Sequence, residues 1–173
     1  NIFWVGLTLM SLGLMTRELW GEGFGRQAGL IFLGSVGLIL NVHSLIPEIA
    51  TLLGYTMALY AFSLYFRRPF RASMVLGFGS GIAFLSGGIT PLVVIFLSAL
   101  LLLVFKNWRI KRYFMFISMS TIITILAISP WLYSFNYLEP ELFLSWVKSI
   151  KFSPELLFNY HLQGVLWLYQ NIG

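Results

Sequence analysis

Six apolar runs follow one another along the chain, and short polar segments separate them. Several runs are shorter than the ~20 residues that cross a bilayer comfortably; such spans are tolerated where the bilayer thins or where neighbouring helices support them. The pattern predicts an all-α integral membrane fold with about six transmembrane helices. The predicted spans are residues 1–15, 28–42, 48–66, 72–86, 90–105 and 113–129.

One break in this pattern, AFLSGGITP at Ala83–Pro91, lies between two runs that carry no charged residue. Its two glycines permit a tight turn with positive φ, and its proline suits the first turn of a following helix. The spacing Gly77-x-x-x-Gly81 just before it favours close packing against another helix. The sequence therefore predicts a tight turn at Ser86–Ile89. A nucleotide-binding loop is disfavoured because the glycines lie inside a membrane span.

The last part of the chain, residues 132–173, mixes polar and aromatic residues. Pro140 and Pro154 are each followed by Glu, and this pair of residue types favours the first turn of a helix. Aromatic side chains gather at membrane–water interfaces. We expect interfacial helices and loop on the outer side of the membrane, and the apolar residues after Glu155 leave open the start of a further span.

Composition agrees with a membrane location. Of the 173 residues, 58% are hydrophobic and only 10% are charged, whereas a soluble domain has about 25% charged residues. The chain therefore has too little polar surface to cover itself in water. It has no cysteine, which excludes disulfides, thiolate catalysis and Cys-based metal sites.

The positive charges are distributed in alternate segments. All but two of the 11 Lys and Arg residues lie in Thr16–Gln27, Arg67–Arg71 and Lys106–Arg112. Because Lys and Arg collect in cytoplasmic loops, these three segments are predicted to face the cytoplasm. The uncharged Ser86–Ile89, the segment His43–Glu48 and everything after Pro130 then face outward. The net charge of +5 is explained in this way, without nucleic acid as a partner.

Short motifs succeed one another in a fixed order. They are GRQAGL at Gly25–Leu30, Pro47-Glu48 followed by Ala58–Tyr60, GSGIAFLSGGITPL at Gly79–Leu92, Ser129–Trp131, and EPELF at Glu139–Phe143. In order, spacing and loop polarity they resemble the G-R-R-A-G-L, Pro-Asp with A-L-Y, G-L-A-F-L-T-K-G-P, P-W and P-E-L-F motifs of bacterial lipid-linked-sugar glycosyltransferases. That family includes the protein O-mannosyltransferases and the aminoarabinose transferases that modify lipid A.

The resemblance implies a type C glycosyltransferase fold in the bacterial inner (plasma) membrane, with several spans. Such enzymes transfer a sugar from a polyprenyl phosphate to an acceptor on the outer side. The family's key acidic residue lies in its first outer loop, and this chain contains no Asp. We therefore expect an internal fragment whose principal catalytic acid lies upstream of residue 1.

One position departs from the family pattern. Where the family has Lys in T-K-G-P, this chain has Gly87 or Gly88, and no Lys or Arg lies between Arg71 and Lys106. The turn therefore lacks the fixed cation that would face a donor phosphate. Ser129-Pro130-Trp131 is expected to end a helix, as the P-W motif does in the family.

His43 and Glu48 are the candidate catalytic residues in the outer loops of the six-span part. His titrates near neutral pH, and both side chains can act in acid–base chemistry or bind a divalent metal. The alternative interpretation is a helix boundary, in which Pro47 and Glu48 form the first turn and His43 lies at the interface. No cofactor is evident, and a divalent metal stays open.

Lys148 and Lys151 are the candidate donor-phosphate cations, with lipid headgroup binding as the alternative. The expected partners are membrane lipids, the polyprenyl-phosphate sugar donor and other membrane subunits. An alternative function is a non-catalytic membrane scaffold subunit that retains the fold within a larger complex, which the missing Lys and Asp favour. A transporter is a third interpretation, but no second, corresponding half is seen.

Overall fold

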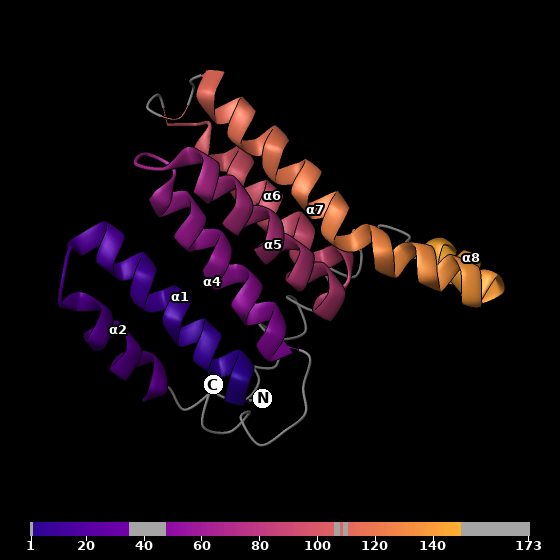
Figure 1. The fold of residues 1–173 in the computed structure, drawn as a ribbon, viewed down its shortest axis with the longest axis horizontal. Helices are drawn as coiled ribbons and strands as arrows, with labels where there is room; N and C mark the ends of the chain where they lie inside the picture. Colours follow the sequence, from indigo (N-terminus) through magenta and orange to yellow (C-terminus); the bar gives the residue numbers. More distant parts are fainter. Residues whose placement is uncertain (1, 35–47, 106–107, 109–110, 150–173) are drawn as a thin grey trace, which may run out of the picture. The chain divides into compact units, whose positions relative to one another are not determined.

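The computed structural model describes residues 2–34, 48–105, 108 and 111–149 (Figure 1). Every regular element in this part of the chain is a helix, so the predicted all-α class is confirmed. The helices are α1 (Ile2–Trp20), α2 (Phe24–Leu33), α4 (Glu48–Leu64), α5 (Pro69–Gly87), α6 (Ile89–Leu102), α7 (Lys111–Leu138) and α8 (Pro140–Ser149).

Three helices among the described residues, α1, α5 and α7, are long and apolar enough to cross a membrane. Helices α4 and α6 are apolar but shorter, with 17 and 14 residues. The predicted span 28–42 lies partly in α2 and partly outside the described residues. The number of spans therefore stays a prediction.

The chain divides into two compact units, Asn1–Tyr133 and Ser134–Gly173. Within the first unit, α4 packs against α1, α5 and α6, and α2 packs against α1. The described part of the second unit contains the end of α7 and α8, where the rings of Phe135, Phe143 and Trp146 lie 5.7 to 6.1 Å apart. Pro140 is the first residue of α8, as its sequence predicts.

Helix α7 does not end at the proline motif. The expectation that Ser129-Pro130-Trp131 terminates a helix is wrong, because α7 continues through Pro130 to Leu138. Proline has no N–H to donate to the carbonyl four residues earlier, here that of Leu126. The Ser129 hydroxyl donates to that carbonyl at 3.0 Å. A nearby serine can thus supply the donor that the proline lacks, as in membrane helices that tolerate proline.

Small residues bring α4 and α5 into close contact. A Cβ atom placed on Gly54 would lie 2.6 Å from the Cβ of Ala83 and 2.7 Å from the carbonyl oxygen of Gly79. Real Cβ contacts are longer than 3.0 Å, so only glycine fits at this position. Leu53 and Leu76 are fully buried beside this contact. The two backbones approach as closely as helices in a bilayer do at small-residue interfaces.

The Gly77-x-x-x-Gly81 spacing has the packing role predicted for it. A Cβ on Gly77 would lie 2.6 Å from the Cβ of Ile123, and one on Gly81 would lie 2.9 Å from the Cβ of Ala127. Both partners belong to α7. The hydroxyl of Thr124 donates to the Gly77 carbonyl at 3.3 Å, which adds a hydrogen bond between α5 and α7.

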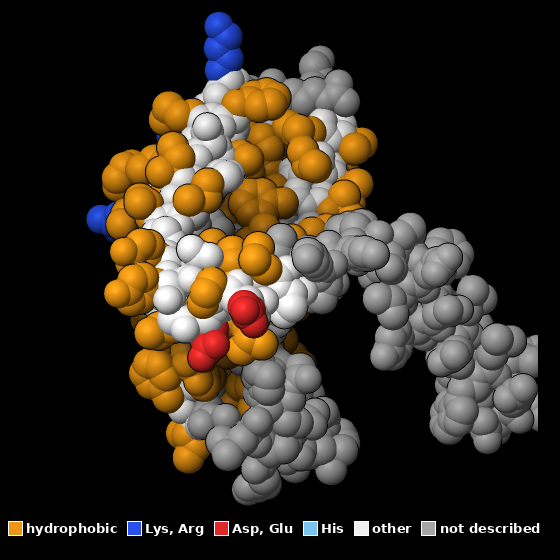
Figure 2. Space-filling model, turned by 90° about the vertical axis from the view of Figure 1, so that its right-hand side faces the viewer, with side chains coloured by type: hydrophobic (Ala, Val, Ile, Leu, Met, Phe, Trp, Pro, Cys, Tyr) orange, Lys and Arg blue, Asp and Glu red, His pale blue; other side chains and the backbone are white. Residues whose placement is uncertain are grey.

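Large apolar side chains cover much of the surface that Figure 2 presents. Leu101 and Ile125, on α6 and α7, keep 59% and 61% of their area exposed. Monomers in water rarely expose apolar patches larger than a few hundred Å². The described helices therefore present a surface that suits lipid better than water.

Candidate functional site

A single residue connects α5 to α6. Gly88 has φ 73° and ψ −148°, and its N–H donates to the Phe84 carbonyl at 2.8 Å. Helix α6 begins at Ile89, so Pro91 lies in its first turn. The tight turn predicted at Ser86–Ile89 is confirmed, with the positive φ on the glycine.

The first turn of α4 lies against this glycine turn. The hydroxyls of Thr51 and Ser86 are 2.9 Å apart. Ser86 also donates to the Ile82 carbonyl at 2.8 Å, which leaves Thr51 as the donor in the pair. A Cβ on Gly87 would lie 2.9 Å from the Thr51 hydroxyl and 2.6 Å from the Cγ of Pro91. Gly87 is thus packed between the two neighbouring helices.

The two candidate catalytic residues relate differently to this contact. Glu48 is the first residue of α4, three positions before Thr51, and this agrees with the helix-boundary interpretation of Pro47-Glu48. The start of the helix that carries Glu48 therefore lies beside the glycine turn. The side chain of Glu48 and the whole of His43 lie outside the described residues.

The candidate phosphate cations belong to the second unit. Lys148 is in the last turn of α8, and its side chain is outside the described part, as is the whole of Lys151. Within the described residues, no three His, Cys, Asp or Glu side chains come together as metal ligands. A divalent metal at His43 and Glu48 stays a prediction.

Neither glycine of the turn can be replaced by lysine without a change in the backbone. At Gly87 the new Cβ would collide with Thr51 and Pro91. At Gly88 there is room, but the φ of 73° with ψ of −148° is a conformation that side chains other than glycine rarely adopt. A lysine at either position therefore requires a turn of different shape, which gives a physical reason for the missing cation.

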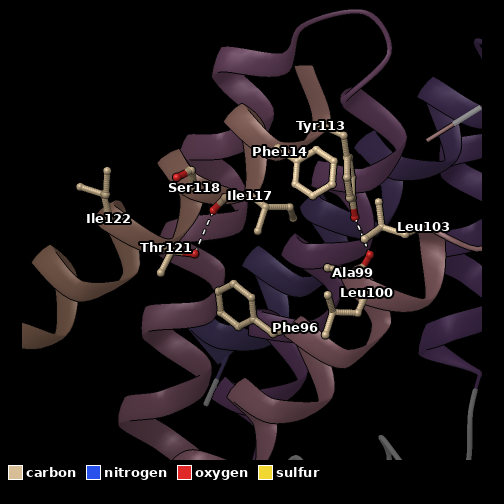
Figure 3. Close-up of a pocket in the computed structure, with 10 residues that line it drawn as sticks. All are labelled: Phe96, Ala99, Leu100, Leu103, Tyr113, Phe114, Ile117, Ser118, Thr121 and Ile122. Carbon is tan, nitrogen blue, oxygen red and sulfur yellow. Dashed lines mark hydrogen bonds between the residues drawn. The ribbon is translucent and has the colours of Figure 1, made fainter. Parts of the chain in front are cut away.

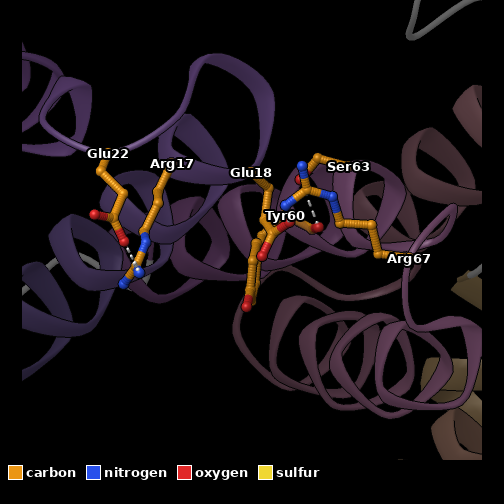
Figure 4. A network of polar contacts seen from close by, with 6 residues as sticks. All are labelled: Arg17, Glu18, Glu22, Tyr60, Ser63 and Arg67. Carbon is orange, nitrogen blue, oxygen red and sulfur yellow. Dashed lines mark hydrogen bonds and ion pairs between the residues drawn. The ribbon is translucent and has the colours of Figure 1, made fainter.

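Polar contacts join two basic segments at the opposite end of the helices (Figure 4). Arg67, in the loop between α4 and α5, lies 3.1 Å from the carboxylate of Glu18 on α1. The Glu18 side chain is only 21% exposed, whereas that of Arg67 is 71% exposed. Arg17 forms a second pair with Glu22, in the turn after α1.

Aromatic rings bring the third basic segment to the same end. Trp108, within the predicted loop Lys106–Arg112, stacks on Tyr65 with centroids 5.2 Å apart and meets Tyr113 at 5.4 Å. Tyr65 follows the last residue of α4, close to Arg67. All three segments that the charge pattern assigns to one side of a membrane therefore lie at one end of the first unit.

These long-range pairs were not predicted from the sequence. Glu18 and Arg67 are 49 residues apart, and Thr51 and Ser86 are 35 residues apart. No local spacing rule connects residues at such distances, so only the packing of α4 on α1 and on α5 identifies them. By contrast, the alternation of charge along the sequence did predict which basic segments lie at the same end of the helices.

Comparison of the chain with protein-family models, with curated proteins and with solved structures gives no match. The resemblance to lipid-linked-sugar glycosyltransferases thus depends on the motifs themselves.

Proposed function

We propose that the chain is part of a multi-pass glycosyltransferase of the bacterial inner membrane. The enzyme transfers a sugar from a polyprenyl phosphate to an acceptor on the outer side. The observation that carries the proposal is the hydrogen-bonded contact between Thr51 and Ser86. It joins the first turn of α4, which begins at Glu48, to the Gly79–Leu92 motif. The resemblance assigns the Pro47-Glu48 and Gly79–Leu92 segments to outer loops around one cavity.

In the proposed reaction, the bond between the sugar's anomeric carbon and the phosphate oxygen breaks, and its electron pair leaves with the phosphate. An acceptor oxygen forms the new bond to that carbon and loses its proton to a carboxylate. Glu48, with His43 nearby in sequence, assists this proton transfer. Lys148 and Lys151 balance the charge of the departing phosphate.

Transfer measured in liposomes tests the proposal. The intact protein is supplied with polyprenyl-phosphate mannose or polyprenyl-phosphate aminoarabinose, and lipid A or an unfolded polypeptide serves as acceptor. Glu48→Gln is expected to lower kcat by about 10²-fold or more, while Glu48→Asp retains part of the rate. Glu141→Gln, on the exposed start of α8, is the charge-matched control. Equal rates for the wild type, Glu48→Gln and Glu141→Gln would refute the role of Glu48.

Labelling of introduced cysteines tests the orientation. Because the chain has no native cysteine, a single Cys at Ser44 or Asn107 is the only thiol in it. A membrane-impermeant maleimide added to intact cells is expected to label S44C and to leave N107C unlabelled. Labelling of N107C alone would reverse the proposed topology.

A non-catalytic scaffold subunit is the second candidate, and the uncharged glycine turn favours it. No Lys or Arg lies between Arg71 and Lys106, and the packing of Gly87 excludes one at that position. Under this alternative, Glu48→Gln leaves the activity of the assembled complex unchanged. Gly87→Leu, which separates α4 from the turn, then releases the chain from its partners in a pull-down.

A further inference from the structure

A groove runs between α6 and α7 on the surface of the first unit (Figure 3). Its volume is about 530 Å³, within the range of pockets that hold small ligands. Phe96 and Leu100 line it from α6, and Phe114, Ile117 and Ile122 line it from α7. Along α7 the lining extends from Tyr113 to Ile122, or about two and a half turns. The groove is therefore long as well as apolar.

Two of the hydroxyl groups along the groove, those of Tyr113 and Thr121, are engaged by the protein's own backbone. Tyr113 donates to the Ala99 carbonyl at 2.7 Å, and Thr121 donates to the Ile117 carbonyl at 2.9 Å. Both bonds are drawn in Figure 3. A ligand here meets mainly carbon atoms, so the groove favours a hydrocarbon chain over a polar molecule.

The groove continues toward the start of α7. A second hollow of about 400 Å³ is lined by Leu100, Leu103, Val104 and Phe114, three of which also line the first. Phe114 lies in the first turn of α7, two residues after Arg112. The groove therefore reaches the start of α7, where Lys111 and Arg112 are.

Two cations stand at this end without a carboxylate near them in sequence. Lys111 and Arg112 are exposed at the start of α7. Lys111 lies three residues before Phe114, on the helix face that lines the groove, whereas Arg112 lies four residues before the buried Phe116, on the face toward Tyr65. The sequence has no Asp or Glu from residue 49 to residue 138, so α5, α6 and α7 carry no acidic side chain. The mouth of the groove is thus complementary to a negatively charged group that is attached to an apolar chain.

The aromatic cluster marks the depth at which such a group would lie. Trp108 precedes the first turn of α7 in the sequence, and its ring stacks on that of Tyr65. Trp and Tyr favour the headgroup level of a bilayer, where a phosphate also lies. The acyl chain of a lipid, which lies below this level, would match the apolar groove. Its phosphate, which lies at this level, would match the cations.

We propose that this groove binds an anionic phospholipid of the leaflet on the basic side. One acyl chain occupies the groove between α6 and α7, and the phosphate lies at Lys111, with Arg112 adding to the positive charge of the same helix end. A second apolar helix would fill the groove but would leave the two cations without a partner. The proposal depends on the membrane location of the chain and is independent of sugar transfer.

Native mass spectrometry of the intact protein in detergent tests the proposal. Dioleoyl-phosphatidylglycerol is the anionic probe, dioleoyl-phosphatidylcholine the zwitterionic one, and inorganic phosphate the headgroup charge alone. We expect retention of one phosphatidylglycerol per chain in preference to phosphatidylcholine. Replacing both cations in K111Q/R112Q should reduce that preference about tenfold or more, because each cation near a lipid surface strengthens binding several-fold.

A second variant tests the acyl chain separately. Ser118→Trp places a large ring in the groove from an exposed position on α7, and it should abolish retention of both lipids at this site. Ser98→Trp, from an exposed position of α6 that does not line the groove, is the matched control. R17Q/R26Q is the control for charge, since those residues lie on α1 and α2. Unchanged circular dichroism and a monodisperse elution profile establish that each variant is folded.

Four results would overturn the proposal. Equal retention of the two lipids by the wild type would remove the role of the cations. Undiminished retention by Ser118→Trp would remove the groove. Loss of a dimer in Ser118→Trp, with lipid binding unaffected by K111Q/R112Q, would assign the groove to a second copy of the chain. Binding of inorganic phosphate that competes fully with phosphatidylglycerol would likewise exclude an acyl-chain site.

Discussion

Two pairs of consecutive helices pack in opposite ways in the first unit. Between α4 and α5 the contact is made by Gly54, Gly79 and Ala83, and no space remains for another carbon atom. Between α6 and α7 the facing residues include Phe96 and Phe114, and a groove of about 530 Å³ remains. The comparison indicates that the size of the facing residues, rather than their hydrophobicity, determines which helix pairs pack without a gap.

The physical reason is that the composition indicates a bilayer, rather than water, as the solvent around these helices. Lipid tails are as apolar as leucine, so burial of an apolar side chain between two membrane helices gains little over its exposure to lipid. Close approach of backbones, and hydrogen bonds between helices, then supply the stability. Half of the apolar stretch of α5 is buried, compared with 22% for that of α7, so α5 lies deeper among the other helices than α7 does.

The largest expected effect comes from adding a carbon atom at the tight pair, α4 and α5. Gly54→Ala should lower the free energy of unfolding by about 2–3 kcal/mol, because its Cβ meets the Gly79 carbonyl, which cannot move without shifting α5. Unfolding by SDS in mixed micelles measures it. Gly6→Ala, on α1 with nothing within 4 Å, is the control and should change stability by less than about 1 kcal/mol. Equal effects of the two variants would contradict the comparison.

The turn beside the tight pair should give the next effect. Gly88→Ala is expected to cost about 1–2 kcal/mol, because alanine at a φ of 73° is strained even though the space around it is open. Gly34, at the end of α2 with a φ of −74°, provides the control Gly34→Ala. Thermal unfolding in the same detergent compares them. A loss at Gly34 as large as that at Gly88 would show that φ is not the cause.

Much of this architecture was accessible from the sequence. Apolar runs predicted the helices, and the glycines at 77, 81, 87 and 88 predicted close packing and the turn. The charge alternation predicted which loops share an end, because Lys and Arg must stay out of the hydrocarbon. These features depend on local residue type, which a sequence displays directly.

Other features required the fold. The motif at Pro130 predicted a helix end, but the hydroxyl of Ser129 provides a donor and α7 continues. Gly54 gave no signal of its own, since its partners Gly79 and Ala83 lie on another helix. Of the candidate site residues, the structure describes only the backbone positions of Glu48, at the start of the helix whose Thr51 contacts the glycine turn, and of Lys148, in the last turn of α8. Non-local packing determines each of these features.

A smaller effect should separate hydrogen bonds between helices from those within one helix. The Thr124 hydroxyl donates to the Ser120 carbonyl of its own helix at 2.9 Å and also to the Gly77 carbonyl of α5 at 3.3 Å. Thr124→Val removes both bonds and is expected to cost about 0.6 kcal/mol, the typical value for a hydrogen bond between helices in a bilayer. Thr121→Val, which loses only a bond to the Ile117 carbonyl of its own helix, should cost less. SDS unfolding of both variants measures the difference. A larger loss of stability in Thr121→Val than in Thr124→Val would show that contacts facing the groove contribute more to stability than the hydrogen bond between α5 and α7.

The smallest effect on stability is expected at the open pair. Leu100 is 61% exposed and lines both hollows, whereas Leu97, at 54% exposed, lies on the same helix away from them. Leu100→Ala and Leu97→Ala should each change the free energy of unfolding by less than about 0.5 kcal/mol, because neither side chain closes a helix contact. Only Leu100→Ala should weaken retention of phosphatidylglycerol, since an acyl chain in the groove loses its dispersion contacts with that side chain. A groove that serves only to join helices would respond in the opposite way, with a loss of stability at Leu100 and no change in bound lipid.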